Sequence, residues 1–170
     1  MPILRVFRTA VAVIGVLAVA PPMHAQPAAS DEREVLAVTQ KLFDAMVACD
    51  EVTIRAITVP EGRLYRLTVG ADGPARSVTL DEFATSFGKC GRKMLERMWQ
   101  PQVRVHKGIA TVWTPYDFWL DGKFSHCGID SFELMKTPRG WVLTGGSYTV
   151  EREGCVPSPL GPPSASAGAR

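Results

Sequence analysis

Three side chains in the last third of the chain could carry acid–base chemistry. Asp121-Gly122 is typical of a two-residue hairpin turn, because the favoured turn requires positive φ at both positions. In a hairpin built on this turn, Asp117 lies opposite His126. A carboxylate beside an imidazole fixes its tautomer and raises its basicity. The spacing therefore predicts Asp117 and His126 as a catalytic pair, with Asp130 on the same face as a third candidate.

Two other interpretations of this group are open. A cross-strand acid and histidine can simply stabilise a hairpin, by about 0.2–1 kcal/mol. Pro115 cannot donate to a strand ladder, and a bulge there would exchange Tyr116 and Asp117 between the faces. His126 and Asp130 share a face in either case, because they are four residues apart on one strand.

Aromatic side chains around this group are candidate ligand contacts, although aromatics in strands more often belong to a core. His106 and His126 are the only histidines after the first 25 residues, and no metal-ligand spacing is present. Serine-hydrolase and phosphate-loop signatures are also absent from the sequence. We therefore predict no metal and no cofactor. The candidate ligand-binding residues are Trp113, Tyr116, Trp119 and Tyr148.

Four cysteines allow three disulfide pairings. The preferred pairing joins Cys49 with Cys90, at two helix ends, and Cys127 with Cys155, which ties the chain end to the sheet. A free, buried Cys127 is the alternative. A Cys127–His126 nucleophile is disfavoured, because neighbouring strand residues point to opposite faces.

The elements that must position these residues begin with helices. Asp31 and Glu34 have capping-box spacing before an apolar face that extends to Val47, and residues 50–58 predict a second, short helix. Residues 63–69 predict a strand. Thr79 and Glu82 form another capping box, which opens a helix ending at Gly88.

From Leu95 onward the pattern predicts successive strands, over 95–106, 109–120, 124–136 and 141–150. Helices followed by a meander indicate an α+β domain. The predicted polar face carries Gln102, Arg104, His106, Trp113, Asp117, His126 and Asp130, and the opposite, apolar face carries Val103, Val105, Ala110, Val112, Tyr116, Phe118 and Ile129.

The ends of the chain predict export. Arg5 and Arg8 precede a short apolar run, and a small residue, Ala25, precedes Gln26, as in a secretory signal peptide over 1–25. A linker over 26–30, a domain over 31–155 and a disordered tail over 156–170 follow. We therefore expect a periplasmic or secreted protein, with no membrane attachment once the signal is removed.

Charge excludes one class of partner. The full chain has 19 basic and 17 acidic residues, and losing Arg5 and Arg8 leaves 17 of each. This balance lacks the basic footprint of a nucleic-acid-binding protein.

The stretch from Thr111 to Asp130, with Ser125-His126-Cys127-Gly128 at its centre, resembles exported bacterial proteins labelled lumazine-binding, SnoaL-like or nuclear-transport-factor-2-like. Gly140-Trp141 and the Tyr148–Cys155 ending are also similar to that family. The resemblance implies a cone-like curved antiparallel sheet with N-terminal helices packed on one face, and a ligand cavity. It implies no particular reaction.

Three functions are therefore compatible with the sequence. The first is an exported domain that binds a small, largely apolar ligand in a cone-shaped pocket. The second is a cofactor-free isomerase, dehydratase or cyclase that uses the Asp/His pair. The third is a non-catalytic module that forms a homodimer.

Overall fold

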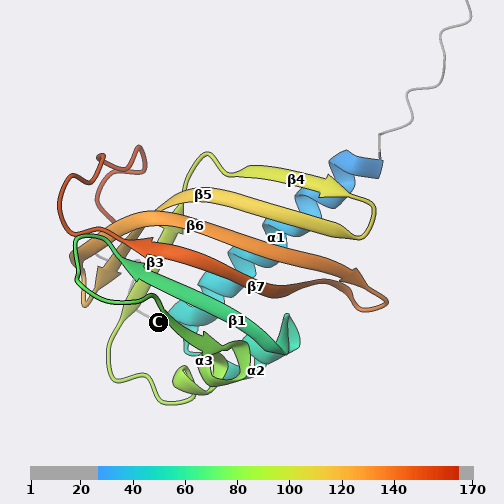
Figure 1. The fold of residues 1–170 in the computed structure, drawn as a ribbon, viewed down its shortest axis with the longest axis horizontal. Coiled ribbons are helices and arrows are strands. Elements are labelled where there is room, and N and C mark those ends of the chain that lie inside the picture. Colours follow the sequence, from blue (N-terminus) through green and yellow to red (C-terminus); the bar gives the residue numbers. More distant parts are fainter. Residues whose placement is uncertain (1–26, 165–170) are drawn as a thin grey trace, which may run out of the picture.

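The computed structural model describes residues 27–164 (Figure 1). The predicted signal peptide and the last six residues of the predicted tail lie outside this range. Helices precede most of the strands, as the α+β prediction requires. The elements are α1 (Pro27–Ala48), α2 (Glu51–Ala56), β1 (Thr58–Thr68), β2 (Arg76–Thr79), α3 (Leu80–Ser86), β3 (Met94–Met98), β4 (Gln102–His106), β5 (Ile109–Leu120), β6 (Lys123–Thr137) and β7 (Gly140–Val150).

The long helix α1 begins five residues earlier than the capping-box spacing predicts, at Pro27 in place of the residue after Asp31. Pro27 occupies its first position, where a missing N–H costs nothing, so the predicted linker residues 27–30 are helical. Asp31 and Glu34 are therefore not a cap. Both contact the Lys136 ammonium on β6 and tie the helix to the sheet. The capping box of Thr79 and Glu82 at α3 is confirmed.

The strands form one curved sheet in the order β2-β1-β7-β6-β5-β3, with β4 also paired to β5. The sheet is mixed, because β1 runs parallel to β7 while the remaining pairs are antiparallel. The predicted wholly antiparallel sheet is therefore wrong at this one pairing. Tight turns identify hairpins, but no local signal gives the direction of two strands as distant in sequence as β1 and β7.

The predicted strand over 95–106 is two strands. The chain turns at Trp99-Gln100-Pro101, where Gln100 has a φ of 47°. As a result β3 pairs with the end of β5, whereas β4 pairs with its beginning. This arrangement lets the sheet edge bend around the body of the molecule.

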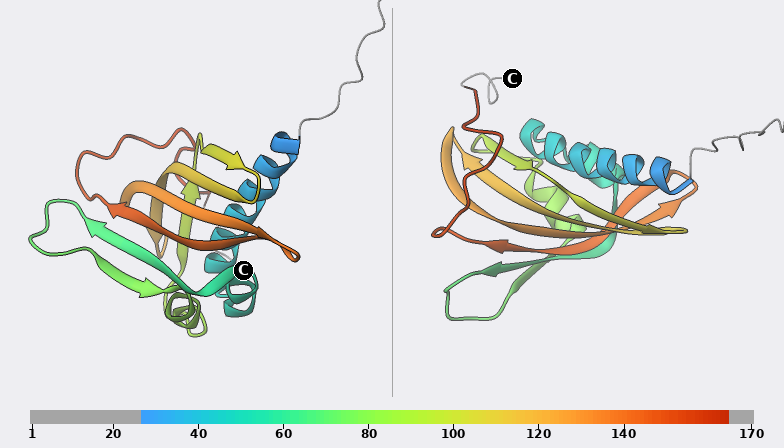
Figure 2. Two further views of the ribbon diagram at one scale, coloured as in Figure 1. Left: turned by 45° about the vertical axis from the view of Figure 1, so that its right-hand side comes forward. Right: turned by 90° about the horizontal axis from the view of Figure 1, so that it is seen from above.

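Helix α1 lies across the concave face of the sheet, as the view from above shows (Figure 2). Its apolar side chains pack with those of α3 and of the inward-facing strand positions. Leu42 and Phe43 of α1 and Val112 of β5 are almost completely buried. The predicted packing of the helices on one sheet face is confirmed.

The β5–β6 hairpin contains a bulge that changes which residues meet. Asp121 and Gly122 both have positive φ, and Trp119 faces Phe124 as predicted. Ser125 is then an extra residue on β6, so Phe118 faces His126 and Asp117 faces Cys127. The predicted Asp117–His126 pair is wrong for this reason.

The same bulge exchanges the two faces of β6. His126 and Asp130 stay together, as predicted, but they lie on the concave, helix-covered face with Tyr116 and Phe118. Ile129, predicted on the apolar face, points the other way.

Both preferred disulfides are present, Cys49–Cys90 and Cys127–Cys155, and no described cysteine is free. The second joins β6 to the segment after β7. Residues 156–164 contain no helix or strand but are placed against the sheet, where the Gly161 carbonyl accepts a hydrogen bond from Arg97. Part of the predicted disordered tail is therefore an ordered strap.

Candidate functional site

A cavity of about 280 Å³ lies between the concave face of the sheet and helices α1 and α3. Most of its wall is apolar, and most of the polar groups come from the strands. The apolar lining residues are Leu42, Phe43, Met46, Leu64, Phe83, Phe87, Met94, Phe118, Leu120, Phe132 and Val150, and the polar ones are Arg66, Glu96, Tyr116, Ser125, His126, Asp130, Tyr148 and Arg152.

Strand pairing brings the polar groups together. Asp130 of β6 is directly opposite Tyr148 of β7, and Tyr148 is in turn beside Arg66 of β1. Phe118 of β5 is directly opposite Glu96 of β3 on one side and His126 of β6 on the other, on the same face of the sheet. Because cross-strand partners share a face, this polar set occupies one continuous area of the cavity wall.

The innermost polar feature is a pair of carboxyl groups, Glu96 and Asp130. Asp130 is 1% exposed, and no N–H or O–H of the described residues donates to its Oδ2. Its carboxyl group is near enough to that of Glu96 for a hydrogen bond between them. Two carboxyl groups can form such a bond only when one of them carries a proton. Such a bond would place one proton between Glu96 and Asp130 in the cavity wall.

The electrostatics of the pair favour this protonated state. Burial, followed by the charge of Glu96, raises the pKa of Asp130 well above its usual value. Burial also raises the pKa of Glu96 to about 7; the charge of Asp117 adds to this effect, and the hydrogen bond with Asp130 opposes it. At neutral pH the pair can both donate and accept a proton.

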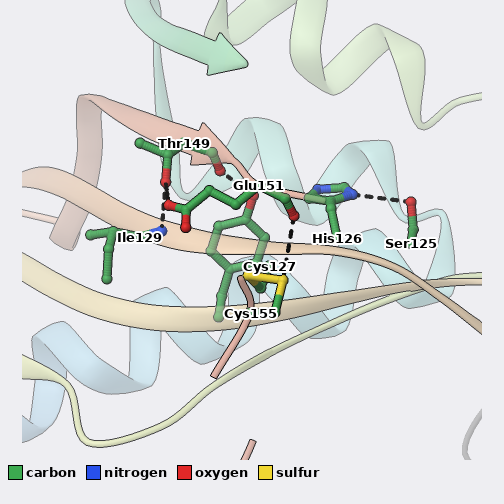
Figure 3. Close-up of a disulfide and its surroundings, with 8 residues drawn as sticks. Ser125, His126, Cys127, Ile129, Thr149, Glu151 and Cys155 are labelled. Atoms are coloured by element: carbon green, nitrogen blue, oxygen red, sulfur yellow. Dashed lines mark hydrogen bonds between the residues drawn. A yellow bond between two sulfur atoms is a disulfide. The ribbon is translucent and has the colours of Figure 1, made fainter. Parts of the chain in front are cut away.

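His126 is a half-buried side chain whose ring lacks the carboxylate partner that the sequence predicts. Its ring stacks on Phe118 with centroids 4.8 Å apart, and its Nδ1 lies 3.1 Å from the Ser125 hydroxyl. Burial, together with the charges of Arg66 and Arg152, lowers the pKa of His126 to about 4. Figure 3 shows the ring turned away from the Cys127–Cys155 disulfide, so the imidazole and the disulfide lie on different sides of the strand.

The two predicted tyrosines line the cavity in different states. The Tyr116 hydroxyl donates a 2.6 Å hydrogen bond to the Thr149 carbonyl, which holds the ring in the wall. Tyr148 makes no hydrogen bond through its hydroxyl among the described residues, and burial raises its pKa. Tyr148 is therefore the tyrosine whose O–H is available to a ligand.

Three predicted site residues lie outside the cavity. Asp117 is on the opposite face of β5, where Arg97 donates to both of its carboxylate oxygens at 2.9 and 2.6 Å. Trp113 is 51% exposed on that outer face. Trp119 packs against Phe124, and the Arg97 guanidinium lies 5.6 Å from its ring centroid.

Sequence reasoning missed two charged strand residues that line the cavity, Glu96 and Arg66, and also Arg152 just after β7. The two strand residues interrupt otherwise apolar strand faces, Glu96 between Met94 and Met98 and Arg66 after Leu64. A charged residue in the middle of an apolar face was the available signal. For Glu96 this signal is weak in the sequence, because the strand predicted over 95–106 begins at Leu95 and does not include the turn at Trp99-Gln100-Pro101.

Among residues 27–164, no group of three or more histidine, cysteine, aspartate or glutamate side chains is placed to hold a metal ion. In the same range, no helix combines the length and apolar character that crossing a membrane requires.

Comparison with solved structures identifies the fold. An NTF2-like superfamily protein from Salmonella enterica serovar Typhimurium superposes with a TM-score of 0.59 at 15% identity, over 75% of this chain and 96% of that one. A protein of unknown function with a cystatin-like fold from Nostoc punctiforme gives 0.59 at 12% identity, over 74% and 94%. An NTF2-like protein from Cytophaga hutchinsonii gives 0.57 at 12%, over 68% and 94%.

These similarities define an α+β protein with the nuclear-transport-factor-2-like fold. The resemblance predicted from the Thr111–Asp130 stretch is thus confirmed at the level of the fold. No protein-family model matches the chain, and no curated protein matches it.

Proposed function

We propose that this protein binds a small, largely apolar molecule that carries a carbonyl or hydroxyl oxygen. The observation that carries the proposal is a cavity of about 280 Å³ with apolar walls and a buried pair of neighbouring carboxyl groups. This volume is near the lower end of small-molecule sites. The occupant is therefore a compact molecule of about one or two rings.

The polar groups define how the molecule lies. Its apolar body packs against Phe83 and Phe87 of α3 and Met46 of α1, which exclude water. Its oxygen accepts the proton shared by Glu96 and Asp130, and the Tyr148 hydroxyl is available as a further donor. A hydrogen bond donated in a dry cavity is stronger than one made in water.

The compartment is part of the proposal. Two disulfides are typical of proteins that work in oxidising surroundings, and this supports the periplasmic or secreted location expected from the amino terminus. The expected homodimer stays a prediction.

Calorimetric titration at pH 6 with acetophenone and with ethylbenzene tests the binding function. The two probes share an apolar body, and only the ketone has an acceptor oxygen. We expect both to bind and the ketone to bind about 5- to 10-fold more tightly, the value of one neutral hydrogen bond. The double variant Glu96→Met with Asp130→Leu, which removes both carboxyl groups and adds no donor, should abolish the preference for the ketone.

A pair of bulky substitutions locates the binding site. Met94→Trp fills the cavity and should abolish binding of both probes, whereas Met135→Trp, on an exposed position of β6, should leave it unchanged. Binding that survives Met94→Trp in a folded protein, or an absence of binding by the native chain, would overturn the proposal.

A second candidate function is cofactor-free proton transfer, as in an isomerase or dehydratase. It is favoured by the Glu96 pKa of about 7, since general acid–base catalysis is most efficient when the pKa lies near the working pH. In this mechanism the ionised pair removes a proton beside a ligand carbonyl, and the protonated pair returns it elsewhere.

Exchange of the acetophenone methyl protons in deuterated water tests this activity. An active pair should accelerate exchange in the native protein, and Glu96→Gln should slow it by about 10²- to 10⁴-fold while binding persists. Exchange no faster than in buffer would reject catalysis and leave the binding function intact.

A further inference from the structure

Two arginines in the cavity lining have no role in the site described so far. Arg66 is half-buried on β1, beside Tyr148, and Arg152 is an exposed residue just after β7. Both line the cavity, and Arg66 also borders a surface hollow with Asp72 and Arg76. They approach from the β1–β7 side, whereas Glu96 approaches from β3 at the other end of the sheet order.

Neither guanidinium is paired within the part of the chain that the structure describes. No ion pair within 4 Å and no side-chain hydrogen bond involves Arg66 or Arg152 there. The Arg66 Nε is buried and has no hydrogen-bond partner. A buried charged donor without an acceptor is costly, so such a group is usually matched by an anion.

The neighbouring acids do not supply that anion. Glu96 and Asp130 are near enough to hydrogen-bond to each other. The Glu151 carboxylate accepts from the Thr149 hydroxyl at 2.8 Å (Figure 3). Asp72 borders a surface hollow with Arg66 and Arg76 but forms no ion pair with either.

The positive charges of the two arginines affect the pKa of a side chain in the cavity. The ring of His126 stacks on Phe118, and burial, followed by the charges of Arg66 and Arg152, lowers its pKa. The β1–β7 side of the cavity therefore carries two unpaired positive charges, and the carboxyl groups of Asp130 on β6 and Glu96 on β3 follow beyond Tyr148. The apolar side chains of α1 and α3 cover the space between them.

We propose that the ligand is an amphipathic monocarboxylate, whose carboxylate is held by Arg66 and Arg152 and whose apolar body fills the cavity toward Glu96 and Asp130. This inference rests on the proposed binding function and adds the ligand's charge to it. A guanidinium matches a carboxylate with two parallel N–H donors, and its weak hydration suits a partly buried site.

Matched probes test the charge. Benzoylpropionate carries an aromatic ring, a ketone and a carboxylate, and benzoylpropionamide is its neutral counterpart. By calorimetry at pH 7.5, we expect the native protein to bind the carboxylate at least 10-fold more tightly than the amide. Arg66→Gln should weaken carboxylate binding by about 10- to 100-fold and change amide binding by less than about 2-fold.

Further variants separate charge from folding. Arg66→Lys keeps the positive charge but loses the two parallel N–H donors of the guanidinium. The affinity of this variant for the carboxylate should therefore lie between those of the native protein and of Arg66→Gln. Arg152→Gln should weaken carboxylate binding by a smaller factor, because water screens the exposed side chain. Arg139→Gln, in an exposed turn away from the cavity, serves as the matched control and should have no effect.

The outcomes distinguish the two proposals. Equal binding of carboxylate and amide, or carboxylate binding that Arg66→Gln does not weaken, would overturn the anion site while the binding function stands. If neither probe binds, and acetophenone does not bind either, the proposed function itself fails.

Discussion

At the scale of single residues, the carboxyl pair is the feature on which the chemistry depends. Asp130 is buried with one oxygen that no described residue donates to, and its neighbour Glu96 belongs to a strand more than thirty residues away in sequence. His126, which the sequence predicts in the catalytic pair, stacks its ring on Phe118 in the cavity wall, and its pKa is lowered to about 4. Burial decides both roles, since it raises the pKa of the acids and lowers that of the imidazole.

Glu96→Gln should stabilise the protein at alkaline pH. The folded pKa of Glu96, about 7, is above its usual value of 4.5, so folding favours the protonated form. Its contribution to stability is complete below pH 4.5 and is lost as the pH rises through 7. The amide cannot ionise, and the free energy of unfolding at pH 8.5 should therefore increase by about 1–3 kcal/mol.

Urea denaturation of both proteins at pH 4 and pH 8.5 measures this difference. Glu61→Gln, at an exposed position, is the control and should not alter the pH dependence. A Glu96→Gln protein that is equally destabilised at both pH values would show that folding does not raise the pKa of Glu96, which contradicts a proton shared by the pair at neutral pH.

At the scale of elements, α3 is a short helix that walls the cavity, and its stability depends on its cap. Thr79 accepts from the Glu82 N–H at 3.1 Å, and Glu82 accepts from the Thr79 N–H at 2.8 Å. The helix then presents Phe83 and Phe87 to the cavity, with ring centroids 4.9 Å apart.

Thr79→Ala should lower the free energy of unfolding by about 1 kcal/mol, because the first turn of α3 loses an acceptor. Thermal unfolding measures the loss, and Ser77→Ala, on exposed β2, is the control. A Thr79→Ala loss no larger than that of Ser77→Ala would mean that the cap does not support the helix.

The elements also show what the sequence could predict. Capping residues and Asp121-Gly122 located α3 and the main hairpin, because each has a local conformational cause. The bulge at Ser125 has no such signal, and this one extra residue moved His126 and Asp130 to the cavity face and left Asp117 outside. The direction of β1 and the approach of Glu96 to Asp130 depend on contacts distant in sequence, which no local pattern contains.

At the scale of the whole molecule, the sheet separates two environments. The concave face carries the cavity, and the outer face carries the Arg97–Asp117 ion pair, the Cys127–Cys155 disulfide and the strap that Arg97 holds through Gly161. Asp117 is only 3% exposed, although it faces away from the helices. The strap and disulfide therefore stabilise the sheet from behind.

Replacing Cys127 and Cys155 together by alanine should reduce the free energy of unfolding by about 3–4 kcal/mol, the loop-closure value for residues 28 apart. Acetophenone affinity should change by less than about 2-fold, because the disulfide lies on the other side of β6 from His126 (Figure 3). Chemical denaturation and calorimetry measure the two quantities. A large loss of affinity in a folded variant would contradict the separation of the faces.

The most direct test of the binding function is a two-dimensional ¹H–¹⁵N NMR titration of the native protein with acetophenone at pH 6. If the cavity is the binding site, we expect saturable shifts at amides of β6 between His126 and Phe132, of β3 around Glu96 and of α3, and none at Trp113 or Met135 on the outer face. An absence of saturable shifts, or shifts confined to the outer face, would contradict it.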